Sequence, residues 1–151
     1  MKLNPFAVAV MLLVPSLAFS QSIEEKQKRA SAETQMSDFA KTMNKYCKTA
    51  LPETGMIDWS TWPVAEDEKG GGNASVSSQC KYVIYGTESL CRDEAIAQET
   101  VAKDVKKFLC KGDGKDEITF EMKGDTLIVH TAFGLRDTDK KAQKWLSKNL
   151  Q

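Results

Sequence analysis

Residues 117–133 read EITFEMKGDTLIVHTAF and contain two runs in which polar and apolar side chains alternate. Such alternation is typical of half-buried β-strands, and the Gly124-Asp125 pair between the runs suits a two-residue hairpin loop. Pairing Lys123 with Thr126 fixes the register. On the face that we expect to be buried, this register places Ile118, Phe120 and Met122 opposite Thr131, Val129 and Leu127. We therefore expect an antiparallel hairpin formed by residues 117–123 and 126–133.

Helical periodicity is clear on both sides of this hairpin. From Met36 onward, apolar side chains at helical spacing form one stripe that continues to Leu51, and Pro52 is expected to stop the helix. After the hairpin, Asp137 or Thr138 can cap a last helix. Its apolar side comprises Ala142, Trp145, Leu146 and Leu150.

Two further elements are expected between the first helix and the hairpin. Residues 80–86 (CKYVIYG) are rich in β-branched and aromatic side chains and predict a strand. Residues 93–109 predict a helix with Ala97, Val101, Val105, Phe108 and Leu109 on one face. The predicted fold class is therefore α+β in the order α-β-α-β-β-α, with helices packed on one face of a small, mainly antiparallel sheet.

The first twenty residues have the three parts of a secretory signal peptide. Lys2 precedes an apolar run from Phe6 to Phe19, and Ala18 and Ser20 place small residues three and one before a cut that would expose Gln21. The alternative is an uncleaved membrane anchor, but a bilayer span needs roughly 20 apolar residues and Pro15 interrupts this run. We expect an exported protein, periplasmic or secreted, with no transmembrane segment in the mature chain.

The mature chain is expected to form one domain. Residues 21–35 are polar and form either a mobile lead-in or an extension of the next helix, and residues 36–151 form a single α+β domain with a flexible loop at 52–79. This loop contains a charged run at 66–69 and three glycines at 70–72, which disfavour regular structure. Asn73 begins an Asn-Ala-Ser glycosylation acceptor, which matters only in a eukaryotic host.

Four cysteines in an exported chain predict two disulfides. A zinc site is the alternative, but the paired C-x₂-C spacing is missing and the one histidine, His130, has no second histidine beside it. Cys91 and Cys110 would flank a helix about 27 Å long, too far for a disulfide. Because that helix should return antiparallel to the strand that begins at Cys80, we predict the pairs Cys80–Cys110 and Cys47–Cys91.

Charge and motif content exclude several classes of function. The 151 residues carry 21 basic and 21 acidic side chains, so a strongly basic nucleic-acid binder is not expected. The acidic groups Asp113, Asp116 and Glu117, and separately Asp137 and Asp139, do not match the spacing of an EF-hand. We find no phosphate-binding loop and no nucleophile motif in the sequence, and we expect no cofactor and no metal.

Two groups of residues are candidates for binding. Lys140, Lys141, Lys144 and Lys148 give the last helix a basic face, which suits an acidic partner or anionic lipid, or is simply a solvated surface. Trp59 and Trp62 lie in the irregular loop. They could form a flat platform for a sugar or a peptide, or could pack against the core.

His130 is the candidate for catalysis. The hairpin register places it opposite Thr119 and diagonal to Glu117 and Glu121, where a carboxylate could orient the imidazole as a general base. The alternative is a polar cluster across the strands. A cleft at His130 would favour a catalytic role, and a flat sheet surface would favour a binding role.

The leading functional expectation is an exported, disulfide-stabilised module without catalytic activity that binds another protein or a component of the cell envelope. One alternative is a small extracytoplasmic hydrolase or transferase that uses His130 with Glu117 or Glu121. Another is a binder of an apolar ligand between helix and sheet, which a large internal cavity would reveal.

Overall fold

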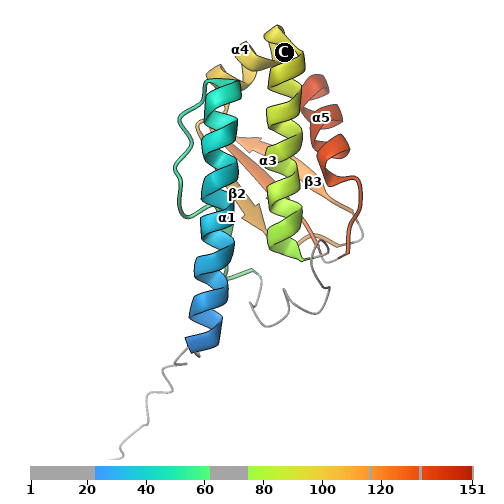
Figure 1. The fold of residues 1–151 in the computed structure, drawn as a ribbon. Coiled ribbons are helices and arrows are strands. Elements are labelled where there is room, and N and C mark those ends of the chain that lie inside the picture. The colour runs from blue at the N-terminus through green and yellow to red at the C-terminus, as the bar shows by residue number, and fades with distance from the viewer. Residues whose placement is uncertain (1–22, 62–74, 116, 133, 151) are drawn as a thin grey trace, which may run out of the picture.

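The computed structural model describes residues 23–61 and 75–150, except residues 116 and 133 (Figure 1). In chain order the elements are α1 (Ile23–Cys47), β1 (Ile57–Asp58), α3 (Val76–Asp93), α4 (Ala95–Asp104), β2 (Lys107–Lys111), β3 (Thr119–Lys123), β4 (Thr126–His130) and α5 (Thr138–Asn149). The predicted signal peptide, Trp62, the charged and glycine-rich run at 66–72 and Asn73 lie outside the described residues.

Helix α1 is longer at its start and shorter at its end than predicted. It begins at Ile23, so the described part of the polar lead-in is helical and extends α1. It ends at Cys47 rather than beside Pro52, because Lys48 adopts a left-handed conformation with φ 54°. The Asn44 side chain holds the following turn: its Oδ1 accepts from the Leu51 N–H at 2.8 Å and its Nδ2 donates to the Leu51 carbonyl at 3.1 Å.

The strand predicted for residues 80–86 is wrong, because these residues lie in the middle of α3. Ser75 caps this helix by accepting a hydrogen bond from the Ser78 N–H at 3.1 Å. The pattern that indicates a helix becomes clear only over a segment longer than residues 80–86. Buried side chains recur at helical spacing along it, namely Cys80, Val83, Ile84, Thr87, Leu90 and Cys91.

The helix predicted for residues 93–109 is also wrong after Asp104. Helix α4 ends at Asp104, and β2 follows at Lys107. In β2 the apolar period changes from helical to alternating: Phe108 and Cys110 are buried, whereas Lys107 is exposed.

The hairpin and the last helix agree with the sequence-based prediction, except that Asp137, at the N-cap position of α5, makes no capping hydrogen bond and Thr138 is already helical. Lys123 pairs with Thr126, Met122 with Leu127 and Phe120 with Val129. Gly124 has φ 63°, the left-handed conformation that the first position of such a loop requires. Ile118 and Thr131 are both buried but lie just beyond the paired residues. In α5, Ala142 and Leu146 are buried, and Trp145 and Leu150 are half-buried.

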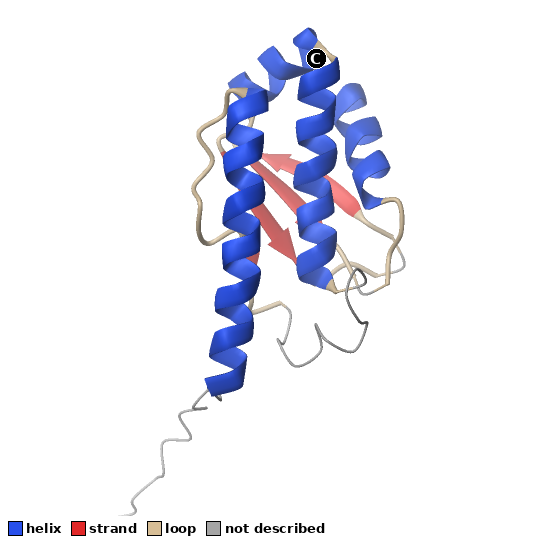
Figure 2. Cartoon of the chain, in the orientation of Figure 1, coloured by secondary structure: helices blue, strands red, loops and turns tan. Residues whose placement is uncertain are grey.

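The sheet is mixed rather than mainly antiparallel. Its strand order is β1-β2-β4-β3, with β1, β2 and β4 parallel and only β3 antiparallel to β4. The fold class α+β is confirmed, but the element order is α-β-α-α-β-β-β-α instead of the predicted one. Helices α1, α3 and α5 lie side by side over one face of the sheet, with α3 between the other two (Figures 1 and 2).

The core lies between this helical layer and the sheet, and two disulfides cross it. Cys47 is bonded to Cys91 and joins α1 to the end of α3, and Cys80 is bonded to Cys110 and joins α3 to β2. These are the predicted pairs, although the expected positions of Cys80 in a strand and Cys110 after a helix were wrong. None of the helices in the described part of the chain combines the length and apolar character of a membrane span.

Candidate binding groove and the His130 cluster

A groove of about 530 Å³ lies between α5 and the edge strand β3. We call it the basic groove. It is lined by Glu117, Ile118, Thr119 and Phe120 from the β3 side, and by Lys141, Lys144, Trp145, Lys148 and Asn149 from the helix. The two sets are far apart in the sequence, and the packing of α5 over the sheet brings them together.

Three of the four predicted lysines point into this groove. Lys141, Lys144 and Lys148 recur three and four residues apart, a spacing that places them on one side of α5. Each is exposed, and within the described residues none has a carboxylate within ion-pair distance. Lys140 differs, because it does not line the groove and its Nζ lies 4.0 Å from Asp137 Oδ1.

Each side of the groove contributes one aromatic residue, Phe120 from β3 and Trp145 from α5. The rings of Phe120 and Trp145 lie with their centroids 5.7 Å apart at an interplanar angle of 34°, and both side chains are half-buried. Such a pair offers rigid aromatic surface in the same groove as the three lysines. β3 pairs only with β4, so its other side is a free sheet edge within the described part of the fold.

Trp59 packs into the body of the protein instead of forming an open platform. Its indole Nε1–H donates to Glu33 Oε1 at 2.8 Å, and the Arg29 guanidinium lies 5.5 Å from the ring centroid. The side chain is half-buried against the core. These contacts favour the packing role for Trp59. The predicted partner of a binding platform, Trp62, lies outside the described residues.

His130 lies between two carboxylates on the sheet face away from the helices. Its Nδ1 is 2.7 Å from Asp113 Oδ1, and its Nε2 is 3.5 Å from Glu121 Oε1. Thr119 is its cross-strand partner, as predicted. Glu117 lines the same open pocket of about 430 Å³ together with Lys115.

This cluster has part of the geometry of an acid–base site. Asp113 can orient the imidazole through Nδ1, as a general base requires, but Nε2 faces a second carboxylate rather than an unoccupied position for substrate. Because Asp113 and Glu121 lie at opposite nitrogens of the ring, they do not converge on one point. Among the described residues, no group of three His, Cys, Asp or Glu side chains is placed to hold a metal ion.

Sequence patterns did not predict that Asp113 contacts His130, or that Phe120 and Trp145 line a groove. The Asp113 contact depends on the parallel pairing of β2 with β4, which aligns Lys111 with His130. Just after β2, the Gly114 N–H donates to the Thr131 carbonyl at 2.8 Å and so holds Asp113 near the imidazole. An antiparallel sheet, as predicted, does not imply this alignment. The alternation of residues 117–123 does indicate that Phe120 faces the helices.

No protein-family model, curated protein or solved structure matches this chain.

Proposed function

We propose that the protein is an exported binding module that holds an acidic, extended segment of another protein in the basic groove. The observation that carries this proposal is the cluster of three lysines without ion-pair partners in the described structure, beside the aromatic pair and a free sheet edge. A cluster of like charges raises the free energy of the unbound protein through mutual repulsion, and an acidic partner relieves that repulsion.

The shape of the groove favours an extended segment. A free strand edge offers backbone N–H and C=O groups, so a peptide can add to β3 as a further strand. Alternate side chains of such a peptide would point toward α5, where Lys141, Lys144 and Lys148 lie. Glu117 is the one carboxylate that the described residues contribute to the lining. It would repel an acidic side chain nearby, so we place the partner's acidic residues over α5.

Export of this module is part of the same proposal. Two disulfides are typical of proteins that fold in an oxidising compartment. The amino-terminal residues Met1–Ser20 have the composition of a signal peptide. A partner would then be another exported protein or a protein of the cell envelope.

The proposal is tested by titrating the oxidised protein, residues 21–151, with a synthetic peptide in which glutamate alternates with valine and threonine. Isothermal calorimetry at low ionic strength measures the affinity. We expect the variant K141E/K144E/K148E to bind at least about tenfold more weakly, because each exposed ion pair contributes up to about 1 kcal/mol. The corresponding lysine peptide should not bind the unmodified protein.

The matched control is K26E/K45E/K103E, which changes the net charge equally at exposed lysines outside the groove. It should change the affinity less than about threefold, and added salt should weaken binding in both the unmodified and control proteins. Equal losses in the two triple variants would show that net charge, and not the groove, attracts the peptide.

A second candidate function is acid–base catalysis at His130, which the open pocket and the Asp113 contact favour. In this reading Asp113 orients the imidazole, Glu121 moves away from Nε2, and Nε2 then takes a proton from water or from a substrate hydroxyl. The test is hydrolysis of a panel of simple ester and phosphoester substrates by the unmodified protein, H130Q and D113N. Activity lost in both variants would support catalysis, whereas equal residual rates in all three proteins would exclude this role for those substrates.

A further inference from the structure

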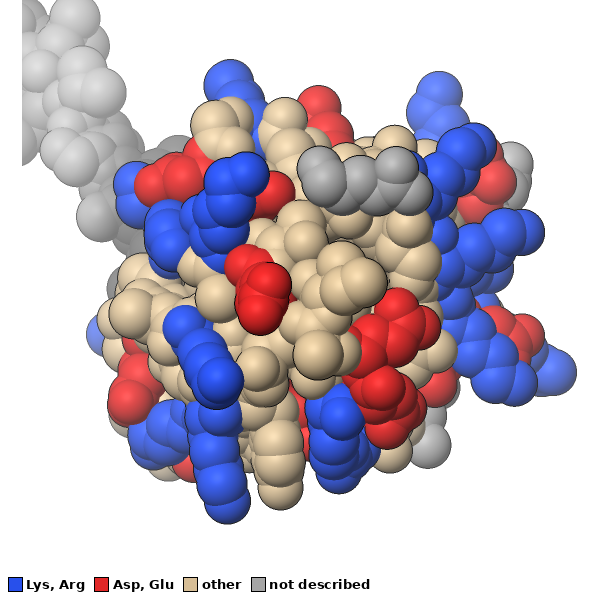
Figure 3. Space-filling model, turned by 90° about the horizontal axis from the view of Figure 1, so that it is seen from above, with Lys and Arg blue, Asp and Glu red and all other residues tan. Residues whose placement is uncertain are grey.

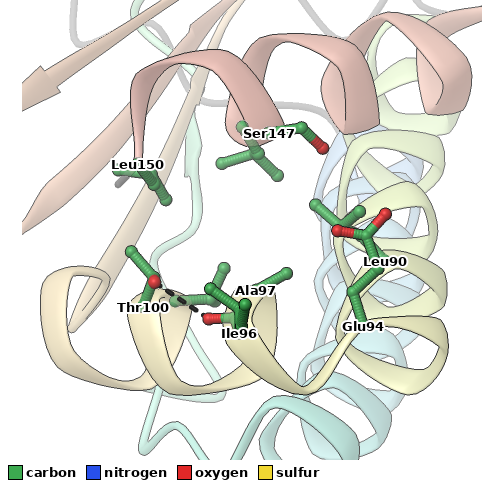
Figure 4. A pocket seen from close by; sticks show the side chains of 9 residues that line it. Leu90, Glu94, Ile96, Ala97, Thr100, Ser147 and Leu150 are labelled. Carbon is green, nitrogen blue, oxygen red and sulfur yellow. Dashed lines mark hydrogen bonds between the residues drawn. The ribbon is translucent and has the colours of Figure 1, made fainter.

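A third pocket, of about 320 Å³, lies where α4, α5 and the end of α3 meet (Figure 4). Its lining comprises Leu90, Glu94, Ile96, Ala97, Thr100, Val101, Leu146, Ser147 and Leu150. Helix α4 packs on α3 but makes little contact with α5, and the pocket occupies this gap. Its volume is at the lower end of the range for small-molecule sites.

The floor of the pocket is apolar and continuous with the core. Leu90, Val101 and Leu146 form it and are at least 94% buried. At the rim, Ile96 is 80% exposed, the largest exposure of any large apolar side chain in the described structure. A space-filling view from above shows an area of uncharged surface with an acidic side chain within it and both basic and acidic side chains around it (Figure 3). Covering the floor and Ile96 would remove apolar surface from water.

Among the described residues, Glu94 supplies the one charged group in this lining. It occupies the N-cap position of α4, yet its side chain makes no capping hydrogen bond. Figure 4 shows the side chain extending from the α3–α4 junction toward α5. Arg92 is the nearest cation along the chain. Its guanidinium contacts other groups, because its Nη1 lies 3.7 Å from Glu88 Oε1 and its Cζ lies 5.3 Å from the Tyr46 ring centroid.

We propose that this pocket binds a small amphiphilic amine. The apolar part of the ligand would lie on Leu90, Val101 and Leu146, and its ammonium group would pair with the Glu94 carboxylate. The Thr100 hydroxyl already donates to the Ile96 carbonyl at 2.9 Å, which leaves Glu94 as the group that selects the charge of the ligand. This site shares α5 with the basic groove but none of its lining residues, so the two proposals are independent.

The test uses three probes of equal chain length: hexylammonium, hexanol and hexanoate. Each is titrated into the ¹⁵N-labelled, oxidised protein, and amide shifts are followed by NMR. We expect saturable shifts at residues 94–101 and 146–150, with hexylammonium binding most tightly and hexanoate most weakly. The variant E94Q should lower the affinity for hexylammonium about fivefold, to the level of hexanol, because an exposed ion pair contributes up to about 1 kcal/mol.

Two further variants make the result specific. E99Q removes an exposed carboxylate of α4 that does not line the pocket, and it should leave the affinity unchanged. A97W should fill the pocket and abolish binding of hexylammonium and hexanol alike. Shifts that do not saturate, hexanoate binding as tightly as hexylammonium, or equal losses in E94Q and E99Q would each overturn the proposal; if A97W fails to fold, the comparison of E94Q with E99Q still decides it.

Discussion

Gly86 sets how closely α3 approaches α5. A Cβ atom at this position would lie 2.4 Å from the Asp139 carbonyl oxygen and 2.8 Å from the Asp139 Cα. Both are backbone atoms, so no change of side-chain rotamer relieves the clash. The helices must separate to accept any larger residue, and α5 carries one wall of the basic groove.

We expect Gly86→Ala to destabilise the protein by about 1–3 kcal/mol, the usual cost of overpacking. Helix propensity acts in the opposite direction, since alanine is favoured over glycine by roughly 1 kcal/mol within a helix. The clash should outweigh that gain. Urea denaturation measures the difference, and S89A, a half-exposed position in the same helix, should stay within about 0.5 kcal/mol of the unmodified protein. If G86A were as stable as the unmodified protein or more stable, the close approach of α3 to α5 at Gly86 would be contradicted.

The disulfides act between elements. Cys47–Cys91 and Cys80–Cys110 both anchor α3, one to α1 and the other to β2, and they close loops with sequence separations of 44 and 30. All four cysteines are buried. Helix α3 is thus fixed both to its neighbour in the helical layer and to the sheet beneath it.

Replacing Cys80 and Cys110 together by alanine should lower the free energy of unfolding by roughly 3–4 kcal/mol, the value expected for a loop of this size. The C47A/C91A pair should cost a similar amount, because loop entropy grows slowly with length. Denaturation of the two double variants measures both effects. Peptide mapping under non-reducing conditions provides the control, and a Cys80–Cys91 link in the unmodified protein would be incompatible with this fold.

The elements also show how far the sequence can predict the fold. The hairpin and α5 were predictable because their apolar periods are unambiguous over their whole length. The helix at residues 80–86 was not predictable from the local composition. The β-branched and aromatic side chains of CKYVIYG favour a strand, but packing of the longer segment 76–93 against the core makes it helical. The disulfide pairs were predicted by excluding Cys91–Cys110 and by expecting the helix over 93–109 to return antiparallel to a strand that begins at Cys80. The pairs are correct, but both steps used wrong elements, because the helix ends at Asp104 and Cys80 lies in α3.

The basic groove could be predicted from the sequence only in part. The lysines of α5 were identified from their spacing, but the groove needs β3 at the sheet edge and α5 packed beside it. The order of strands in a mixed sheet depends on contacts between distant segments, as in the direct pairing of β2 with β4, between which β3 lies in the sequence. Local periodicity carries no information about such an order.

The proposed export predicts where the mature chain begins and that its cysteines are oxidised. Intact-mass spectrometry of the protein purified from the extracytoplasmic fraction of its host should give a chain that begins at Gln21, with four fewer hydrogens than the reduced form because two disulfides are present. The reduced protein is the control for the second part. A chain that retains Met1 and stays with the membrane fraction would show that residues 1–20 act as an anchor instead.

The measurement that tests the central claim most directly is NMR mapping of the glutamate-containing peptide on the ¹⁵N-labelled, oxidised protein. We expect saturable amide shifts that concentrate at residues 117–123 and 141–149, the two sides of the basic groove. These shifts should disappear in K141E/K144E/K148E and persist in K26E/K45E/K103E. Shifts spread over all basic surfaces, or centred on residues far from β3 and α5, would contradict the central claim.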